Sequence, residues 1–229
     1  MRSDRDGLGR VLITGGASGL GAAVADAVER EGGRPMVLDR RGTDRVEHRI
    51  VDLADLRATE ALVADLAHDG LDAVVTCAGI DSWGPLAEVP AADWDRVVAV
   101  NLLGTAAVVR AALPALMRSR GHVVTVASTL GLRAQPEATA YCAAKFGVIG
   151  FSRALGSELA GRVRVTCLIP GGMRTPFVED RPERYRPVPE AILMDPQDVA
   201  AVIVQALRST GSAEARELVI TPAGESSWP

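Results

Sequence analysis

A tyrosine and a lysine four residues apart are the side chains of this sequence best suited to proton transfer. Tyr141 and Lys145 fall at positions i and i+4 of a segment with helical periodicity, so they lie one above the other on one helix face. A neighbouring ammonium favours the phenolate, and we expect it to lower the pKa of Tyr141 toward neutrality. A surface Tyr–Lys pair is the other interpretation. The chain has a single lysine among 25 basic residues, so chance alone would place it here in about one case in a hundred.

Two further polar side chains are candidates to act with Tyr141. Ser128 ends a predicted strand, and its hydroxyl can hold a substrate oxygen while the phenol moves a proton; it can equally cap a turn. Asn101 is the one asparagine of the chain and falls inside a predicted helix, where asparagine is a poor helix former. Its amide can bridge water to Lys145 and extend a proton relay, or it can mark a helix kink or an interface hydrogen bond.

A glycine-rich loop, Thr14–Gly21, lies between the first predicted strand and the first predicted helix. Glycines permit a tight turn and a close approach to a pyrophosphate, and the helix start offers N–H groups and a positive dipole end. Because the cluster follows a strand and opens a helix, we interpret it as a dinucleotide-binding loop rather than a plain turn. The cofactor-binding residues expected in the loop are Gly15, Ser18, Gly19, Leu20 and Gly21.

The choice between NAD and NADP depends on Asp39, which closes the second predicted strand. A carboxylate there can accept hydrogen bonds from both adenosine ribose hydroxyls and repels a 2′-phosphate, which favours NAD. Arg40 and Arg41 support the alternative, because either could clamp that phosphate. The glycine loop carries no basic residue, so NAD is the preferred cofactor and NADP the less favoured one.

Two more segments lie at the carboxyl ends of predicted strands, where open α/β sheets bind ligands. One contains Asp52 and Leu53, and the other contains Ala78 and Gly79. From the spacing alone, either segment could contact the cofactor or form an ordinary turn.

The elements that must position these residues alternate between short apolar runs and segments of helical periodicity. Continuous Val/Ile/Leu runs are typical of parallel strands covered on both faces. Because such strands are joined by right-handed crossovers, we expect a single-domain, doubly wound α/β sheet of about seven strands over residues 1–229. The predicted strands are 10–14, 35–38, 48–51, 71–76, 121–126, 163–169 and 217–221, and the predicted helices are 19–31, 56–68, about 91–117 (kinked or shortened at Pro114), 138–160 and about 196–208.

Composition narrows the class of protein. The net charge of −4 argues against a general nucleic-acid binder. We see no apolar run approaching the 18 or more residues of a membrane span, and no secretory signal, so no membrane partner and a cytoplasmic location are expected. The cysteines Cys77, Cys142 and Cys167 have no metal-ligand spacing and are interpreted as reduced thiols, so no metal site is predicted. No hydrolase motif is present.

Together these motifs resemble the short-chain dehydrogenase/reductase family, and the resemblance runs from Val11 to about Thr221. It is carried by Thr14–Gly21, Asp52-Leu53, Cys77-Ala-Gly79, Asn101, Ser128, Tyr141-x-x-x-Lys145 and Pro170-Gly171, in family order and spacing. The resemblance implies a Rossmann-like fold in which Tyr141 is the catalytic acid/base and Ser128 orients the carbonyl or alcohol. It further implies that Lys145 binds the nicotinamide ribose, that Asn101 supports a relay water, and that Pro170, Gly171 and Thr175 contact the cofactor.

The implied function is an NAD(P)-dependent oxidoreductase that interconverts a secondary alcohol and a ketone by hydride transfer. The alternative is a catalytically silent dinucleotide-binding sensor or scaffold. The resemblance also implies a homodimer or homotetramer through the helices at about 91–117 and 138–160, and a short substrate lid around 175–195. Cys77 stands where the family usually has asparagine, and the C-terminal segment Thr221–Pro229 replaces the usual ending.

The substrate is expected to be a small carbonyl or alcohol compound. Apolar residues near the predicted pocket, among them Trp83 and Met173, suggest an apolar body. Several arginines of the lid region lie near the pocket mouth and could hold an anionic group, although ordinary solvated arginines are the preferred interpretation. These arginines are Arg133, Arg174, Arg181, Arg184 and Arg186.

Overall fold

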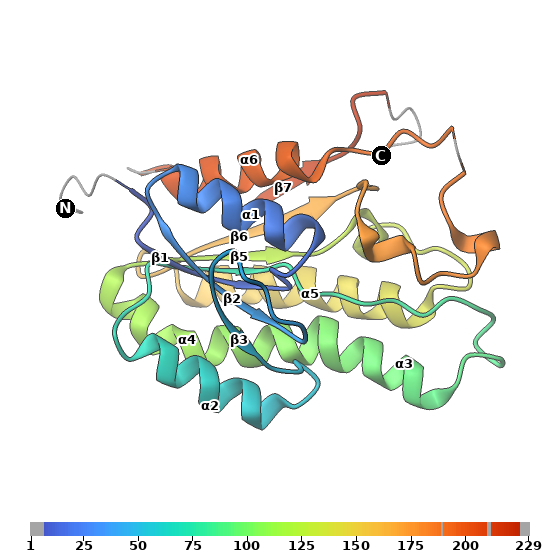
Figure 1. The fold of residues 1–229 in the computed structure, drawn as a ribbon, viewed down its shortest axis with the longest axis horizontal. Helices are drawn as coiled ribbons and strands as arrows, with labels where there is room; N and C mark the ends of the chain where they lie inside the picture. Colours follow the sequence, from blue (N-terminus) through green and yellow to red (C-terminus); the bar gives the residue numbers. More distant parts are fainter. Residues whose placement is uncertain (1–6, 189, 210–211, 225–229) are drawn as a thin grey trace.

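The computed structural model describes residues 7–188, 190–209 and 212–224, so the predicted domain of residues 1–229 extends past the described residues at both ends. Seven strands form one parallel sheet with the order β3-β2-β1-β4-β5-β6-β7 (Figure 1). The predicted fold class is confirmed. The strands are β1 (Arg10–Thr14), β2 (Arg34–Asp39), β3 (Glu47–Ile50), β4 (Ala73–Thr76), β5 (His122–Val126), β6 (Arg164–Pro170) and β7 (Glu217–Ile220).

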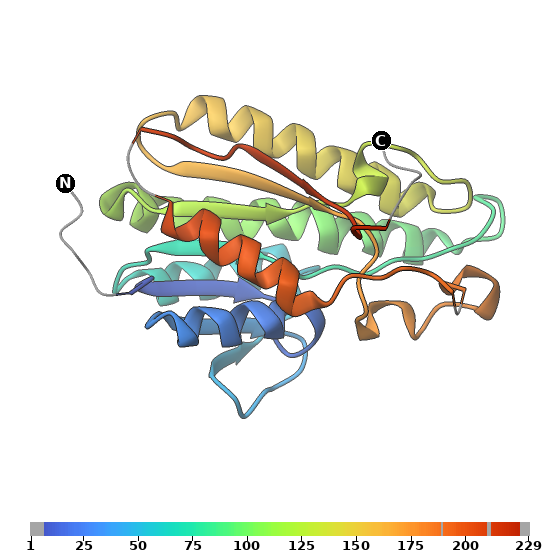
Figure 2. The ribbon, with the colours of Figure 1, turned by 90° about the horizontal axis from the view of Figure 1, so that it is seen from above.

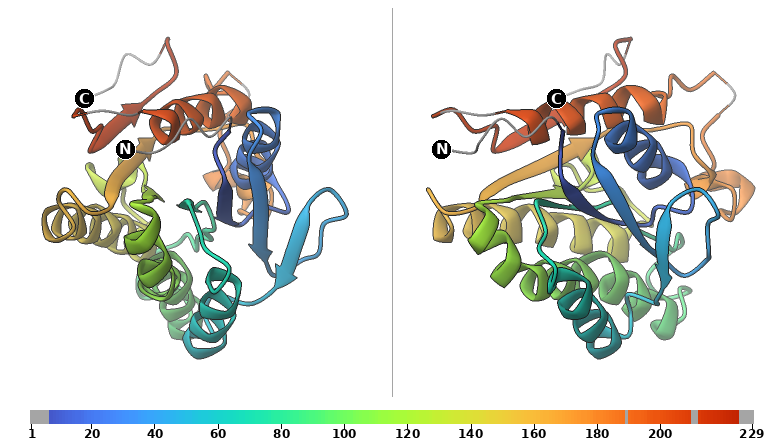
Figure 3. Two further views of the ribbon diagram at one scale, coloured as in Figure 1. Left: turned by 90° about the vertical axis from the view of Figure 1, so that its left-hand side faces the viewer. Right: turned by 60° about the vertical axis from the view of Figure 1, so that its left-hand side comes forward.

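Helices cover both faces of the sheet. Helices α1 (Gly19–Arg30) and α6 (Pro196–Arg208) pack together on one face, and their apolar side chains share a core with β1 and β4. On the other face, α2 (Leu56–Ala67) packs against α4 (Thr105–Ser119), with α5 (Thr139–Glu158) beside them. Figures 2 and 3 show the two helical layers from above and from the side.

The continuous apolar runs of the sequence become the central strands. Every residue of β4 and of β5 is buried, because helices cover both of their faces. The edge strand β3 is exposed at most of its positions, and the edge strand β7 is exposed at alternate positions. A sheet covered on both sides therefore explains why apolar runs, rather than an alternating pattern, marked the central strands.

The strand order reverses between β1 and β4. Thr14 and Thr76, the last residues of these two strands, are register partners, and the chain leaves them toward opposite faces. Ligands of open α/β sheets bind in the crevice at such a switch point, outside the carboxyl ends of the strands. The fold thus brings the glycine loop after β1 and the Cys77–Gly79 segment after β4 to one place.

The long central helix is interrupted where the asparagine lies. Helix α3 (Ala91–Val98) continues through a π-helical turn, Ala99–Gly104, into α4. Of the two predicted effects of Pro114, a kink or a shortened helix, the shortening was wrong, because α4 passes through Pro114 and ends at Ser119. The irregularity instead surrounds Asn101, and the Thr105 hydroxyl donates a hydrogen bond to the Asn101 carbonyl (2.9 Å).

The same helix corrects an expectation about membranes. By length and composition alone, the 29 residues of Ala91–Ser119 would suffice to cross a membrane, so the expectation that no apolar run is long enough was wrong. Half of its most apolar stretch is buried in this structure, where Val108, Ala112 and Leu116 belong to the core. A buried core helix can have the same length and apolar composition, so these two properties are weak evidence for a membrane segment.

The segment after β6 leaves the sheet and returns to it across the open end of the pocket. Met173 and Met194 form an isolated parallel bridge, and the Arg174 N–H donates to the Met194 carbonyl (2.9 Å). Between them lie two short 3₁₀ turns, Pro176–Val178 and Glu183–Tyr185. This segment, 174–194, is called the lid below; it is drawn in orange at the right of Figure 2.

Candidate active site

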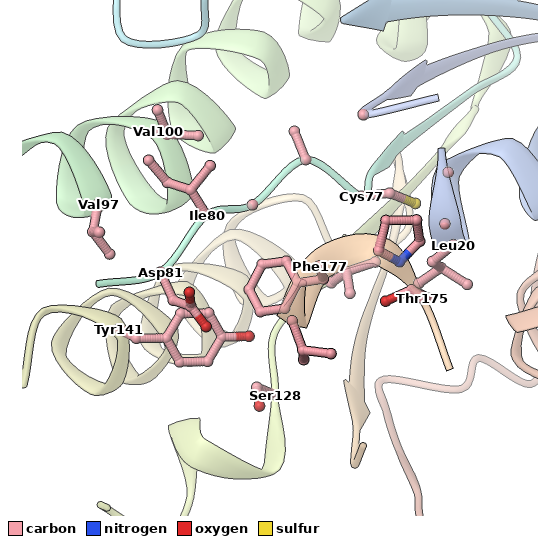
Figure 4. A pocket seen from close by; sticks show the side chains of 18 of the residues that line it. Leu20, Cys77, Ile80, Asp81, Val97, Val100, Ser128, Tyr141, Thr175 and Phe177 are labelled. Carbon is pink, nitrogen blue, oxygen red and sulfur yellow. The ribbon is translucent and has the colours of Figure 1, made fainter. Parts of the chain in front are cut away.

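A cavity of about 760 Å³ opens at the carboxyl ends of the strands, under the lid (Figure 4). Apart from Asn101, every residue predicted to bind the cofactor or act in catalysis lines it. These lining residues are Gly15, Ser18, Gly19, Leu20, Gly21, Asp39, Asp52, Leu53, Ala78, Gly79, Ser128, Tyr141, Lys145, Pro170, Gly171 and Thr175.

The glycine loop is packed so closely that side chains would not fit at two of its positions. Gly15 has φ +71°, and a Cβ atom there would lie 2.7 Å from the Ala78 backbone. A Cβ atom on Gly21 would collide with the Gly15 carbonyl oxygen. The Ala78 N–H also donates to the Thr14 hydroxyl (3.1 Å). The segments after β1 and β4 are therefore held together at the floor of the cavity.

The start of α1 has the features of a phosphate site. Ser18 is the N-cap residue, and its side chain makes no capping hydrogen bond to the helix. The first N–H groups of a helix have no partners within the helix, and the dipole is positive there. Thr175 from the lid lies beside Gly19, 3.3 Å from where a Cβ atom of that glycine would be. The residues present therefore fit a dinucleotide pyrophosphate at this end of the cavity.

Asp39 lies between the glycine loop and the end of β2. Its carboxylate accepts hydrogen bonds from the backbone N–H groups of Ala17 (3.0 Å) and Arg41 (3.1 Å). The Arg41 guanidinium reaches back across the loop and donates to the Ser18 hydroxyl (3.3 Å). The Asp39 carboxylate and the Arg41 guanidinium thus both lie where the adenosine ribose of a dinucleotide would lie. The geometry therefore contains both the group that favours NAD and a group that could bind the 2′-phosphate of NADP.

Asp52 is fixed by neighbours on both sides. It accepts hydrogen bonds from the Arg96 guanidinium (2.7 Å) and from the Ala54 N–H (3.0 Å). Partial burial raises its pKa, but these two hydrogen bonds together with the charges of Arg96 and Arg40 outweigh burial and hold the pKa below its ordinary value. Leu53 beside it is buried against the π-helical turn, where a Cβ atom on Gly104 would meet Leu53.

The side chain of Asn101 is fully buried and pairs with the backbone of Ile80. Its Oδ1 accepts from the Ile80 N–H (2.9 Å), and its Nδ2 donates to the Ile80 carbonyl (2.8 Å). Each polar atom of the amide keeps capacity for a second hydrogen bond, so the water bridge from this amide to Lys145 stays a prediction. Asn101 fixes the chain that leaves β4, and its Oδ1 and the Lys145 Nζ lie 3.4 Å and 3.8 Å from where a Cβ atom of Gly79 would be.

Lys145 lies inside the protein with 4% of its surface exposed. Its Nζ donates to the Val126 carbonyl at the end of β5 (2.9 Å) and lies 5.5 Å from the centre of the Tyr141 ring. Burial disfavours the ammonium and lowers the pKa of Lys145 to about 8. At pH 7 the side chain is still mostly protonated, so the fold holds a cation directly behind the phenol.

Tyr141 is buried, and its pKa is shifted in the direction opposite to the one expected from the sequence. Burial raises the pKa of Tyr141 to about 12, although a hydrogen bond from Ser128 favours the phenolate. The i, i+4 spacing correctly places Lys145 beside the ring, but the ammonium is turned to the Val126 carbonyl. In the protein alone, burial of the phenol therefore outweighs the Ser128 hydrogen bond and the charge of Arg181, which both lower the pKa of Tyr141.

Ser128 combines two of the roles considered for it. Its hydroxyl caps the short 3₁₀ turn Thr129–Gly131 by accepting from the Leu130 N–H (3.1 Å), and it is also hydrogen-bonded to Tyr141. Figure 4 shows Ser128 and Tyr141 at the same end of the pocket as Phe177 of the lid. The ring centroids of Tyr141 and Phe177 are 5.8 Å apart.

Sequence reasoning missed an ion pair in this part of the cavity. Asp81 and Arg181 both line it, and their charged groups are 2.5 Å apart. The available signal was a carboxylate two residues beyond Gly79, at a strand exit, with an arginine in the lid. No sequence spacing links positions 81 and 181, so the pairing emerges only from the fold.

Comparison with known proteins agrees with this geometry. A family model described as short chain dehydrogenase matches residues 9–186. The chain belongs to the short-chain dehydrogenase family. Members of this family are oxidoreductases that bind NAD or NADP, so this short-chain dehydrogenase is an enzyme of that class.

Relatives and solved structures extend the match over nearly the whole chain. The 3-oxoacyl-[acyl-carrier-protein] reductase FabG of Thermotoga maritima is 32% identical, over 84% of this chain and 87% of its own. The glycine betaine reductase ATRR of Emericella nidulans is also 32% identical over 93% of this chain, but this chain spans only 19% of its length. An alcohol dehydrogenase from Thermococcus sibiricus has the same fold, with a TM-score of 0.85, 23% identity and coverage of 94% and 97% of the two chains.

The pairing of Asn101 with Ile80 gives a stability prediction. Asn101→Ala removes both hydrogen bonds and leaves the partly buried backbone N–H and carbonyl of Ile80 unpaired, which should lower the free energy of unfolding by about 2 kcal/mol. Urea denaturation of the cofactor-free protein measures this loss. Asp95→Asn, at an exposed position of α3, is the matched control and should change stability by less than about 0.5 kcal/mol. Equal stabilities for the two variants would contradict the assigned contacts.

Proposed function

We propose that this short-chain dehydrogenase interconverts a secondary alcohol and a ketone, with Tyr141 as the acid/base. The observation that carries the proposal is the placement of a buried phenol, hydrogen-bonded to Ser128 and backed by Lys145, in one cavity with the glycine loop. A phenol and a hydroxyl that face the same space can together hold one substrate oxygen. That arrangement suits proton transfer to or from a carbonyl oxygen.

The residues that would hold the cofactor follow from their places along the cavity. The α1 N-terminus with Ser18 and Gly19 takes the pyrophosphate, and Asp39 takes the adenosine ribose. Thr175 and Lys145 lie toward the nicotinamide end. When bound, the nicotinamide supplies or accepts the hydride.

The protein's own groups complete the reaction. The raised pKa keeps the Tyr141 phenol protonated at pH 7, so it is ready to donate its proton to a ketone oxygen that also accepts from Ser128. The phenolate that accepts a proton from an alcohol forms only as the pH rises, so alcohol oxidation should become faster with rising pH. Lys145 contributes a positive charge behind the phenolate that forms. Asn101 is a positioning residue, because it acts through the Ile80 backbone.

A catalytically silent dinucleotide-binding sensor is the less favoured function. A degenerate site should lack one of the polar groups, whereas here the tyrosine, serine and lysine line one cavity and the asparagine fixes its wall. We therefore retain the enzyme as the proposal.

We propose NAD as the preferred cofactor. The Asp39 carboxylate is fixed by two backbone N–H groups at the position that an adenosine ribose would occupy, and its negative charge opposes a 2′-phosphate. The Thermococcus sibiricus enzyme is described as complexed with 5-hydroxy-NADP. At 23% identity that likeness supports the fold and leaves the cofactor of this chain to experiment.

We also propose that the enzyme is a homodimer or homotetramer. Leu103 and Phe146 are large apolar side chains on the π-helical turn and on α5, and they are 44% and 46% exposed in the single chain. Apolar side chains on neighbouring helices of one face are typical of a subunit contact.

The central test replaces the proton-transfer groups. Reduction by NADH of a panel of aliphatic ketones, cyclic ketones, hydroxyketones and acetoacetyl-CoA gives kcat for each variant. Tyr141→Phe removes the proton, and Lys145→Arg puts a wide planar group where the compact ammonium meets the Val126 carbonyl; each should lower kcat by about 10²-fold or more. Tyr185→Phe, at the only other tyrosine, should stay within a few-fold. Near-full activity of folded Lys145→Arg or Tyr141→Phe would refute the assigned roles.

The cofactor proposal is tested by comparing kcat/KM for NADH and NADPH. The wild-type enzyme should prefer NADH, and Asp39→Ala should weaken NADH use while easing entry of the 2′-phosphate. Arg41→Ala serves as the matched variant across the same site and should leave NADH use within about two-fold, since its backbone N–H to Asp39 is retained. A wild-type preference for NADPH that Arg41→Ala abolishes would assign the selection to the arginine.

The assembly is tested by multi-angle light scattering at micromolar concentration. We expect a dimer or tetramer of the 24.0 kDa chain, and Leu103→Asp together with Phe146→Asp should shift it toward the monomer. A 24.0 kDa species for the wild type would contradict the proposal.

A further inference from the structure

A buried ion pair stands beside the proposed reacting groups. The Asp81 carboxylate, on the segment after β4, meets the Arg181 guanidinium from the lid at 2.5 Å. The two side chains are only 8% and 13% exposed. Both line the cavity that contains Tyr141, and Figure 4 shows Asp81 at the same end of the pocket as Tyr141 and Phe177. The charges of both groups act on the phenol of Tyr141.

The Arg181 guanidinium is already engaged by groups of the protein. Its guanidinium lies 4.9 Å from the Trp83 ring centre and 5.3 Å from the Phe177 ring centre. Its Nε and Nη2 are directed to Asp81, and Nη1 donates to the Tyr185 carbonyl (3.5 Å). Among the arginines considered from the sequence as anion binders, Arg181 is the one whose residue lines the cavity in the described structure. The positive charge of Arg181 is therefore neutralised by Asp81, which disfavours its use as the binding group for a substrate carboxylate or phosphate.

Asp81, in contrast, keeps one oxygen available. Its Oδ2 accepts from the Trp83 indole N–H (2.8 Å) and from Arg181 Nε (2.7 Å). Its Oδ1 accepts no hydrogen bond from any group in the described part of the chain. One oxygen of this mostly buried carboxylate is therefore held by the protein, and the other can accept a hydrogen bond from a molecule in the cavity.

From this geometry we propose that Asp81 Oδ1 accepts a hydrogen bond from a second hydroxyl of the substrate, so that the substrate class is polyhydroxylated alcohols and their hydroxyketones. The inference rests on the proposed function, because it places the reacting oxygen at Tyr141 and Ser128. Arg181 neutralises Asp81, so the pair has no net charge with which to draw in a cation. An apolar substrate would leave the carboxylate oxygen dry and unpaired. A neutral hydroxyl donor satisfies it, and a site built to bind a hydroxyl rejects analogues that lack one.

The probes are cyclohexanol and the 1,2-, 1,3- and 1,4-cyclohexanediols, oxidised with NAD⁺ at one fixed alkaline pH. Using three diols avoids assuming the spacing between the two hydroxyls. Wild-type kcat/KM should be at least about ten-fold higher for one or more diols than for cyclohexanol, mainly through a lower KM. Acetoacetyl-CoA reduction with NADH is measured beside them.

Two variants test whether Asp81 causes the preference. Asp81→Leu combined with Arg181→Met removes both charges together, so neither is left buried alone, and it should bring the diol-to-cyclohexanol ratio of kcat/KM close to one. Glu183→Leu, an exposed lid carboxylate outside the cavity lining, should leave the ratio unchanged. Circular dichroism verifies folding, and the wild-type ratio judges the proposal even if the double variant fails to fold.

The outcomes distinguish failure of the polyol assignment from failure of the proposed oxidoreductase function. Three outcomes would overturn the polyol assignment and leave the oxidoreductase function intact. The first is a wild-type diol-to-cyclohexanol ratio near one, and the second is an unchanged ratio in the folded double variant. The third is turnover of acetoacetyl-CoA or simple ketones without turnover of any diol. No turnover of any alcohol or ketone with NAD(H) or NADP(H) would overturn the proposed function, and the inference would fall with it.

Discussion

The ammonium of Lys145 lies inside the protein, and the burial of that one charge is the constraint on which the pocket depends. Removing an ammonium from water is costly, and the fold offers it the Val126 carbonyl at the end of β5. That contact fixes the side chain of α5 against the sheet and places it behind the ring of Tyr141. A guanidinium, which this chain uses at every other permanently charged basic side chain, is wider and carries more donors than the position can satisfy.

The rest of the site follows from how the chain crosses between the two helical layers. Because the strand order reverses between β1 and β4, the two segments that follow these strands meet at the floor of the cavity. Gly15 fits against Ala78 only without a side chain, and Asn101 fixes Ile80 a few residues further on. The lid closes the open end through Arg181 and its contact with Asp81. Each contact joins segments that are distant in sequence.

Much of this was predictable from the sequence. Apolar runs gave the central strands, because helices bury both of their faces, and the glycine loop and Tyr141–Lys145 spacing gave the residues that line the cavity. What failed depends on three-dimensional surroundings. The pKa of Tyr141 rises because burial outweighs the groups that favour the phenolate. The pairing of the Asn101 amide with the Ile80 backbone was likewise not visible in the sequence. The spacing of residues along the sequence does not show how deeply a side chain is buried or which distant residue it contacts in the fold.

The most direct test uses the fact that Lys145 is the only lysine. Protein labelled with ¹³C-lysine gives a single side-chain Cε signal, so its NMR titration reports this one group without assignment. The account predicts a midpoint at about pH 8, because burial disfavours the ammonium. A midpoint near 10.5, the value of a solvated lysine, would show that the ammonium lies in water and would contradict the pocket described here.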